Sequence, residues 1–441
     1  MILQTYVNGS WLDAAEITFF GSTKQEHVRI TYLTDYLINA STPFENDTEF
    51  AVSVNAPVSP VAADYSRWPA LFDDLLPVGK TRQWWITRLD ISHLNVFEAD
   101  TRLLEMTCAA PIGNLRIKEA FDRIENTSNI RFPTAIVCKL DHDFLEYANS
   151  QGAAVGGATG AVGVAPKLLL MLEHNEVYID ADFAGNSISA KPYLVKFARN
   201  QRTQRDNNIL RAEGVFYKVL PSILQHTQIP TMDPDKIHIK DVDDHISLWL
   251  PRFDVFEQNG KLHRLGVESI YSIINAGPGS AWDHFNVIEK LWEKLQHSFA
   301  YTKSEFVTEY VIRDLLNVVF GNSDNHGRNI SFIKKDSKIY YAPIYDFAPM
   351  KADEEQITRL FKWGDGCEIG GDISYQKIAL RLQPYVSTET LLSSLRDIAK
   401  NLVNLHTLLV DNDCPEEILA FPTIGFVHVK EKMMRMGLIN D

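Results

Sequence analysis

A stretch that could carry chemistry is "SDNHGRN" at 323–329, which follows an apolar run. Asp324 and Asn329 stand five positions apart, in the pattern D-x-x-x-x-N. A turn here would bring a carboxylate and an amide oxygen to one side of a loop. Phosphoryl transfer uses such a pair, because a carboxylate accepts or orients the attacking hydroxyl and an Asn oxygen helps to hold Mg²⁺. The pattern therefore predicts Asp324 as a catalytic base and Asn329 as a metal ligand.

A second carboxylate must hold the same metal, and Asp346 is placed to supply it. Asp346 ends the short apolar segment "PIYD", which follows a "KKDSK" turn. The alternative is structural, with Asp324 capping a turn and Asn329 as a surface amide. His326 could also be a metal ligand. Because no second His lies at ligand spacing, we predict an orienting or packing role for His326.

The stretch at 155–167 is rich in glycine. The glycines are Gly156, Gly157, Gly160 and Gly163. Between two strands, they would let backbone N–H groups approach a phosphate closely. The stretch is not a Walker A motif, because no G-K-[ST] follows. A flexible surface loop or a tight packing turn is the alternative.

Lys196 lies within the apolar segment "YLVKFAR". A Lys among apolar strand neighbours is costly unless it is paired. In a kinase-like lobe Lys196 would reach the nucleotide phosphates, and Glu213 in the following helix could orient it. The alternative is a Lys on the solvent face of an alternating strand. The Gly-rich stretch, the strand Lys, the helix Glu, the D-x-x-x-x-N pattern and the last Asp occur in the order of a protein kinase.

Hydrophobic periodicity predicts the elements that must position these residues. Residues 1–60 show short alternating segments separated by turn residues, which indicates strands. Further strands are predicted in "TAIVCKL" (134–140), "PKLLLMLEHNEVYID" (166–180, with a hairpin turn at "HNE"), "KPYLVKFAR" (191–199), "DKIHIKD" (235–241) and "HISLWLPRFD" (245–254).

Helical spacing of apolar residues recurs mainly in the second half of the chain. The predicted helices are 68–89, the end of 112–124, 207–224, 280–299, 303–321, 388–410 and 427–436. Ser304 is the expected cap of the fifth, without the Glu of a full capping box. Strands with one helix are thus followed by a helical half, which indicates an α+β fold of two lobes rather than repeated βαβ units.

Composition limits the function classes. The chain has 441 residues, of which 45% are apolar and 23% charged, so it can bury a sizeable core. The net charge of −14 argues against autonomous nucleic-acid binding, which needs phosphate-neutralising Lys and Arg. The four cysteines show no CxxC spacing and are predicted to be reduced and mostly buried.

Targeting and membrane segments are not expected. The N-terminus has no basic region followed by a long apolar run, so we expect no signal peptide and a cytoplasmic protein. The longest weakly polar run, 153–172, contains Pro166 and Lys167 and begins with small residues. We therefore predict no transmembrane span there.

Several segments together resemble the HipA family of bacterial Ser/Thr kinases, the toxin half of HipBA-type modules. They are "LFDDLLP" (71–77), "YLVKFA" (193–198), "LPRFD" (250–254), "GNSDNHGRNISF" (321–332) and "PIYDFAP" (343–349). The first resembles the family's F-D-N-L-L-P segment, and the last two are the most specific. The resemblance covers roughly residues 70–350.

The resemblance implies an α+β, protein-kinase-like two-lobed fold with an added N-terminal β-rich subdomain and an all-helical C-terminal lobe. The expected domains are an N-terminal subdomain at 1–130, a kinase N-lobe at 131–250 and a helical C-lobe at 251–441. The N-lobe would carry the Gly-rich loop and the lysine that binds ATP.

The resemblance also implies an ATP-dependent Ser/Thr protein kinase. Asp324 would be the base, while Asn329 and Asp346 would hold Mg²⁺. The residues expected to bind ATP are Gly160, Gly163, Lys167, Lys196, Glu213, Leu250, Arg252 and Phe253. The last three belong to the hinge that would hold adenine.

The family further implies two protein partners. One is a small helix-turn-helix antitoxin, through which alone the protein would contact DNA. The other is a protein substrate, for example a translation factor, because the better-known members phosphorylate an aminoacyl-tRNA synthetase.

The Gly-rich loop departs from the family pattern. That loop usually carries an autophosphorylated Ser ahead of a G-x-Q-x-K run. Here Gly160 stands in the place of the Ser and Ala165 in the place of the Gln, while Lys167 is kept. Thr159 is the nearest hydroxyl.

Three other functions fit parts of the pattern. A small-molecule kinase of the aminoglycoside or choline type would also use a D-x-H-x-x-N loop, but gives no role to "LFDDLLP". A non-catalytic binding protein with a degenerate kinase fold would explain the altered Gly-rich loop. A metal-dependent nuclease would rest on Asp324 and His326 alone.

Overall fold

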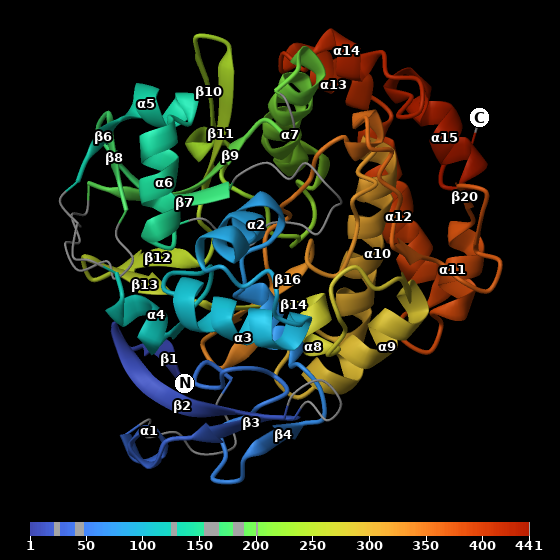
Figure 1. Ribbon diagram of the computed structural model, residues 1–441. Coiled ribbons are helices and arrows are strands. Elements are labelled where there is room, and N and C mark those ends of the chain that lie inside the picture. The colour runs from blue at the N-terminus through green and yellow to red at the C-terminus, as the bar shows by residue number, and fades with distance from the viewer. Residues whose placement is uncertain are drawn as a thin grey trace.

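Three groups of elements follow one another along the chain in the computed structural model (Figure 1). The structure describes residues 1–21, 27–39, 48–124, 130–153, 167–179, 189–199 and 202–440. The first group, blue and cyan in Figure 1, and the second, teal to green, are each built on a sheet of their own. The third, yellow to red, is mostly helical.

The first group is an antiparallel sheet with short helices. Its described strands lie in the order β4-β3-β2-β1-β5. They are β1 (Ile2–Val7), β2 (Ser10–Phe20), β3 (His27–Tyr32), β4 (Ala63–Tyr65) and β5 (Leu115–Ile117). Along β3, Val28, Ile30 and Tyr32 are buried and alternate with more accessible residues, as expected for a sheet covered on one face. The prediction of strands in 1–60 is confirmed.

The predicted helix at 68–89 is only partly helical, while the segment 112–124 is helical at its end, as predicted. The group's helical elements are α1 (Thr34–Asn39), the 3₁₀ helix η1 (Ala70–Asp74), α2 (Gly79–Arg88), α3 (Val96–Thr107) and α4 (Lys118–Asp122). The segment 68–89 is interrupted before α2, because Pro77 lacks an N–H and restricts the residue before it. The segment 112–124 begins with strand β5, which pairs with β1.

The second group is a sheet in the order β10-β11-β9-β7-β8-β6 among the described strands. They are β6 (Phe132–Pro133), β7 (Lys167–Glu173), β8 (Glu176–Tyr178), β9 (Lys191–Phe197), β10 (His238–Val242) and β11 (His245–Pro251). The group's helical elements are α5 (Thr134–Lys139), α6 (His142–Ser150), α7 (Gln204–Ile223) and η2 (Pro234–Lys236). The predicted β7–β8 hairpin, the other strands after residue 166 and helix α7 are confirmed.

The segment before the Gly-rich stretch is helical, so the prediction of a strand at 134–140 is wrong. Its residues form α5, with Thr134, Val137 and Cys138 buried at i, i+3 and i+4. This is the period of a helix with one covered face. Helix α6 follows, so the last described element before the Gly-rich stretch is a helix rather than a strand. Gly160 and Gly163 themselves lie outside the described residues.

The third group is mostly helical. Its helical elements are α8 (Ile270–Ile273), α9 (His284–Leu295), α10 (Lys303–Phe320), η3 (Met350–Ala352), α11 (Tyr375–Arg381), α12 (Thr388–Leu402), α13 (Leu405–Asp411), α14 (Glu416–Leu419), η4 (Phe426–His428) and α15 (Val429–Arg435). The four helices predicted after residue 280 are all present, but the one at 388–410 is divided into α12 and α13.

The prediction of an all-helical C-terminal lobe is wrong. The described strands in it are β12 (Val255–Gln258), β13 (Lys261–Arg264), β14 (Gly266–Ser269), β15 (Trp282–Asp283), β16 (Ser331–Lys335), β17 (Lys338–Tyr341), β18 (Phe361–Lys362), β19 (Glu368–Ile369) and β20 (Asp372–Ile373). The β16–β17 hairpin pairs with β14 in a small sheet. Buried Phe332, Ile339 and Tyr341 anchor this hairpin in the core. The hairpin lies between Asn329 and Asp346, so it fixes the end of the loop before it and the start of the segment after it.

Helix α10 positions the loop that carries Asp324. It begins at a full capping box, in which Thr302 accepts from the N–H of Glu305 and the Glu305 carboxylate accepts from that of Thr302. The cap is therefore Thr302, and the prediction of Ser304 is wrong. The helix ends at Gly321, whose φ of 72° favours glycine. A Cβ there would also lie 2.8 Å from Cγ1 of Ile424.

Helix α7 joins the second group to the third. Phe216 on this helix packs edge-on against Phe320 of α10, with ring centroids 4.8 Å apart. The same ring contacts Phe347 and Phe426, each at 5.9 Å. Since burying one aromatic ring stabilises a fold by about 1.5–3 kcal/mol, this cluster holds α7 firmly on the helical part.

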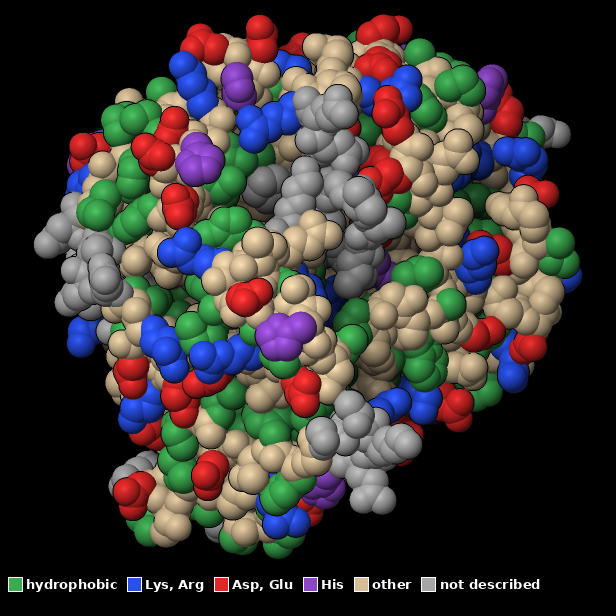
Figure 2. Space-filling model, viewed as in Figure 1, with side chains coloured by type: hydrophobic (Ala, Val, Ile, Leu, Met, Phe, Trp, Pro, Cys, Tyr) green, Lys and Arg blue, Asp and Glu red, His purple; other side chains and the backbone are tan. Residues whose placement is uncertain are grey.

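The surface charges and the buried cysteines agree with what the composition predicts. On the face drawn in Figure 2, Lys and Arg side chains are interspersed with Asp and Glu rather than gathered into one basic patch. The four cysteines are free and buried, as predicted. In the part of the chain that the structure describes, no helix is both long and apolar enough to cross a membrane.

Candidate active site

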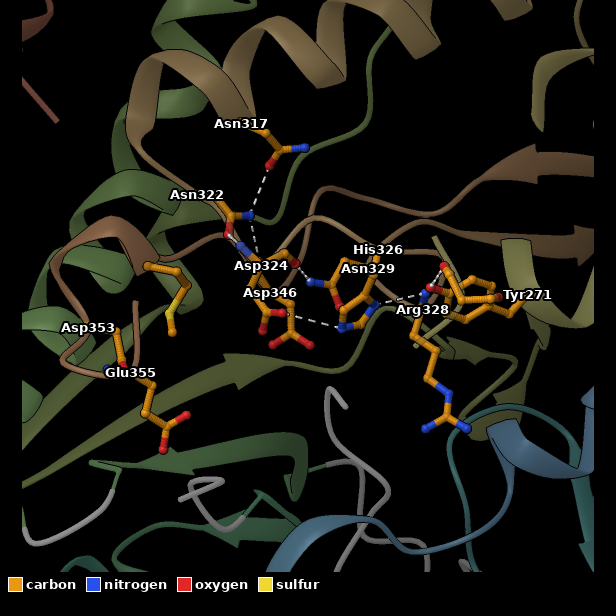
Figure 3. A network of polar contacts seen from close by, with 12 residues as sticks. Tyr271, Asn317, Asn322, Asp324, His326, Arg328, Asn329, Asp346, Asp353 and Glu355 are labelled. Carbon is orange, nitrogen blue, oxygen red and sulfur yellow. Dashed lines mark hydrogen bonds and ion pairs between the residues drawn. The ribbon is translucent and has the colours of Figure 1, made fainter. Parts of the chain in front are cut away.

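Asn322 holds the backbones of the predicted base Asp324 and of the predicted metal ligand Asp346 (Figure 3). Its Nδ2 donates to Oδ1 of Asn317 at 2.9 Å and to the backbone oxygen of Asp346 at 3.1 Å. Its Oδ1 accepts from the N–H of Asp324 at 3.3 Å. Asp346 has a φ of 50°, a left-handed conformation that Asp tolerates better than most residues. Asn322 thus couples the loop after α10 to the segment after β17.

Asn329 is oriented by the same loop. Its N–H donates to the backbone oxygen of His326 at 3.0 Å, and its side-chain Nδ2 donates to the backbone oxygen of Asp324. Its Oδ1 is buried and has no hydrogen-bond partner among the described residues. A buried, unpaired carbonyl oxygen is costly. The chemistry of Asn329 therefore fits a cation ligand.

Two lysines meet on neighbouring strands. Lys167 on β7 and Lys196 on β9 are register partners, so their side chains lie on the same face of the sheet. Nζ of Lys167 lies 2.8 Å from both carboxylate oxygens of Asp346. Nζ of Lys196 contacts Asp346 and also Glu213 on α7. The structure thus brings together four side chains that were predicted from separate motifs.

Burial and charge set the protonation of this cluster. Burial alone would raise the pKa of Asp346, but Lys167 and Lys196 hold it well below its usual range. Burial likewise disfavours the charge on Lys196, yet Asp346 and Glu213 raise its pKa above the ordinary value. Burial lowers the pKa of Lys167, and Asp346 opposes that shift. The cluster thus sets two carboxylates beside two lysine amines, groups of the kind that bind phosphates.

The pKa of Asp324 is shifted in the opposite direction from that of Asp346. Burial and the nearby Asp346 charge raise the pKa of its carboxyl from 3.8 to about 6. A general base works best when its pKa lies close to the operating pH. Asp324 is therefore a better proton acceptor than an ordinary Asp.

His326 supports the loop. Burial lowers the pKa of its imidazole to about 4, so the ring is neutral at pH 7. Its Nε2 lies 3.5 Å from Oδ1 of Asp324, and its ring stacks on Tyr271. Among the described residues, no three His, Cys, Asp or Glu side chains form a metal-binding group. The contacts with Asp324 and Tyr271 fit the predicted orienting role of His326, which stays a prediction.

A cleft opens on one side of the lysine–aspartate cluster. It spans about 930 Å³, open to solvent, and its lining includes six predicted site residues: Lys167, Lys196, Asp346, Leu250, Arg252 and Phe253. The Arg252 guanidinium is engaged with Asp254, whose carboxylate also accepts from the N–H of Gly113. Arg252 therefore braces the hinge rather than facing the cleft as a free cation.

A second, smaller chamber of about 620 Å³ lies on the other side of the cluster. Asp324 and Glu213 line this chamber and not the first. Lys167, Lys196 and Asp346 line both chambers. The cluster is thus the point where a group bound in one chamber could meet a group bound in the other.

Two residues of the site were missed in the sequence. Tyr217 donates to Glu213 at 2.8 Å and accepts from the N–H of Phe347 at 3.1 Å, so it ties Glu213 to the segment after Asp346. Its i+4 spacing from Glu213 on α7 is a signal that could have found it. Asn322 accepts from the N–H two residues on, as an Asx turn does, but its bond to the distant Asp346 left no local signal.

Gly327 allows the catalytic loop to pack against Tyr271, and its replacement is a test of that packing. A Cβ at Gly327 would lie 2.4 Å from Cδ1 of the ring, so Gly327→Ala must displace the loop or the ring. We expect a loss of about 1–3 kcal/mol in the free energy of unfolding and a shifted Asp324. Urea unfolding measures the first. Gly277→Ala is the control, because nothing lies within 4 Å of a Cβ there; equal stability of the two variants would contradict the packing.

Fold and site together define a class: an α+β, two-lobed, protein-kinase-like protein with an additional N-terminal sheet. The family described as HipA-like C-terminal domain matches residues 159–404, and the family described as HipA N-terminal domain matches residues 21–118. The first match covers more than half of the chain. The chain belongs to the HipA family.

A solved structure of a HipA agrees with this fold. A HipA of Shewanella oneidensis MR-1, in complex with HipB and its operator DNA, is 16% identical with a TM-score of 0.62, covering 99% of this chain and 96% of that one. A proinflammatory kinase of Helicobacter pylori, CtkA, is 14% identical with a TM-score of 0.38, covering 63% and 90%. A search among curated proteins finds no match. The predicted family and the kinase-like two-lobed fold are confirmed.

Proposed function

We propose that this protein is an ATP-dependent Ser/Thr protein kinase and the toxin of a toxin–antitoxin pair. The observation that carries the proposal is the Lys167–Asp346–Lys196 cluster at the junction of two chambers, with Asp324 on the far side. The lining of the larger chamber combines apolar hinge residues with the amino groups of two lysines, which suits a nucleotide.

The residues have distinct roles in this proposal. The ammonium groups of Lys167 and Lys196 bind phosphate oxygens, and Glu213 orients Lys196. Asp324, with its raised pKa, accepts the proton of a substrate hydroxyl that enters from the second chamber. Asn329 and Asp346 are the groups that would hold Mg²⁺, which neutralises phosphate charge when bound. Gly160 and Gly163 remain predicted phosphate contacts.

The partner side of the proposal is a small helix-turn-helix antitoxin. It rests on membership of the HipA family and on the Shewanella relative, which was solved with HipB and DNA. The net charge of −14 favours a contact with DNA through such a partner rather than directly. Co-elution of this protein with the product of a short neighbouring helix-turn-helix gene tests this part. Separate elution of the two proteins would contradict the proposal of an antitoxin partner.

Nucleotide binding is the first test of the kinase proposal. Calorimetric titration with Mg·ATP should show one site, and Lys196→Met should weaken binding by about 10- to 100-fold, since a charge-assisted contact is worth about 1.5–3 kcal/mol. Lys191→Met is the matched control, because Lys191 is exposed at the start of the same strand. If the wild-type protein binds no Mg·ATP, the protein is a binding module with a degenerate kinase fold.

A further inference from the structure

Arg328, next to the predicted metal ligand Asn329, reaches out of the catalytic loop into the N-terminal group. Its Nη2 donates to the backbone oxygen of Asp73 at 2.8 Å, and its Nε lies 4.0 Å from Oδ1 of Asp74. The Arg328 side chain is only 10% exposed. Figure 3 shows it extending away from Asp346. The guanidinium therefore connects two parts of the chain that are 255 positions apart.

The acceptor segment, η1, is held in place independently of Arg328. The Asp74 carboxylate accepts from the N–H of Ser269 at 2.9 Å and from its hydroxyl at 2.8 Å, at the start of α8. The N–H of Ala70 donates to Oδ1 of Asn275 at 3.2 Å. The position of η1 is therefore fixed by contacts other than the one with Arg328.

The backbone of Arg328 is tied to both predicted catalytic segments. Its N–H donates to Nδ1 of His326 at 3.2 Å, and its carbonyl accepts from the hydroxyl of Tyr345. Tyr345 directly precedes Asp346, and Arg328 directly precedes Asn329. A shift of Arg328 would therefore move the residues on either side of the proposed metal position.

Charge complementarity supports the contact. Burial raises the pKa of Asp73 to about 7 and that of Asp74 to about 6, and the Arg328 cation opposes both rises. Without the Arg328 cation, the half-buried carboxyl groups of Asp73 and Asp74 would lose a positive charge that favours their ionised forms. The contact is thus favourable for both the loop and the N-terminal segment.

We propose that Arg328 is a positioning residue through which the N-terminal β-rich group, by way of η1, holds the catalytic loop in its working geometry. The N-terminal group is then a part of the catalytic centre and not only an added module. The inference rests on the proposed kinase function for its consequence in rate, but the geometric claim stands apart from it.

Arg328→Ala is the test, with Arg67→Ala as the matched control. Arg67 also joins the N-terminal group to the rest of the chain, since its Nη2 donates to the backbone oxygen of Asn275 at 2.5 Å, but it does not touch the catalytic loop. We expect Arg328→Ala to lower kcat by roughly 10- to 100-fold, because small misplacements of catalytic groups have such effects. Arg328 also lines the larger chamber, so the Kd for Mg·ATP is measured beside kcat to separate a loss of binding from a loss of positioning. Arg67→Ala should keep the wild-type kcat.

Hydrogen exchange of the peptide at 322–330 is the readout that does not depend on activity. It should become faster in Arg328→Ala and stay unchanged in Arg67→Ala, with thermal unfolding measured for both. Arg328→Lys should restore part of the protection and part of kcat. Unchanged exchange in Arg328→Ala, or equal loss in both variants, would overturn the inference. If the wild-type protein transfers no phosphate, the proposed function fails while the exchange comparison still decides the positioning role.

Discussion

Replacing Asp324 with asparagine is expected to lower the rate of phosphoryl transfer by about 10²–10⁴-fold, the usual contribution of a general base. The amide keeps the size of the side chain but accepts no proton. Asn322 accepts its hydrogen bond from the backbone N–H of residue 324, which the substitution keeps, so the loop should keep its shape. The affinity for Mg·ATP should stay within about threefold, because Asp324 does not line the larger chamber. Steady-state kinetics and calorimetry separate the two quantities.

The same variant is expected to be more stable than the wild-type protein at pH 7. The folded protein raises the pKa of Asp324 from 3.8 to about 6, so it holds this proton more tightly than the unfolded chain does. Ionisation at pH 7 therefore costs up to about 3 kcal/mol of folding free energy, a cost that Asn does not have. The difference should be absent below about pH 4 and grow as the pH rises to 6. Urea unfolding at pH 4 and pH 7 measures it; an Asp324→Asn protein that is less stable at pH 7 would contradict the burial argument.

Replacing Asp346 with alanine is expected to abolish transfer and also to destabilise the fold. Asp346 is the shared partner of Lys167 and Lys196, and all three side chains are at most 14% exposed. Removing one partner of a buried ion pair lowers the free energy of unfolding by about 3–5 kcal/mol, because the remaining charge is uncompensated. Urea unfolding gives this loss, and calorimetry should show weaker Mg·ATP binding.

A second substitution separates the two effects of Asp346→Ala. Lys167→Met in the same background removes one of the stranded ammonium groups. The double variant should therefore regain stability without regaining activity, and the double-mutant cycle gives the coupling between the two residues. If Lys167→Met destabilises the double variant further, the two side chains are not partners in solution.

The sequence predicted the site best where each part is a local motif. Lys196 could be placed because a Lys in an apolar strand needs a partner, and Glu213 because the next helix follows in kinase order. In the structure Lys196 and Glu213 form an ion pair, and Lys196 also contacts Asp346. The catalytic and metal-binding roles of Asp324, Asn329 and Asp346 stay predictions.

Contacts between distant parts of the chain could not be predicted. The register that sets Lys167 opposite Lys196 depends on strand pairing, and no single segment specifies it. The contact of Arg328 with Asp73 depends on how the N-terminal group docks on the rest. Neither leaves a local pattern in the sequence, because each is made only in the folded chain.

The errors in secondary structure have physical causes. The segment at 134–140 has β-branched residues and reads as a strand, yet its buried positions recur at helical spacing and packing overrides propensity. The cap at Thr302 was missed in favour of Ser304, although Glu305 lies at the right distance only from Thr302. The small strands of the C-terminal lobe are two to five residues long, which is too short for a clear period.

The central claim is tested most directly by incubating the protein with Mg²⁺, ATP labelled in its γ-phosphate and a bacterial lysate, beside Asp324→Asn. The account predicts that the wild-type protein labels one or a few proteins on Ser or Thr, and that Asp324→Asn labels them at least about a hundredfold more slowly. Equal labelling by both proteins would contradict the role of Asp324. Label that enters only small molecules would contradict the protein-kinase assignment and point to a phosphotransferase of the aminoglycoside or choline type.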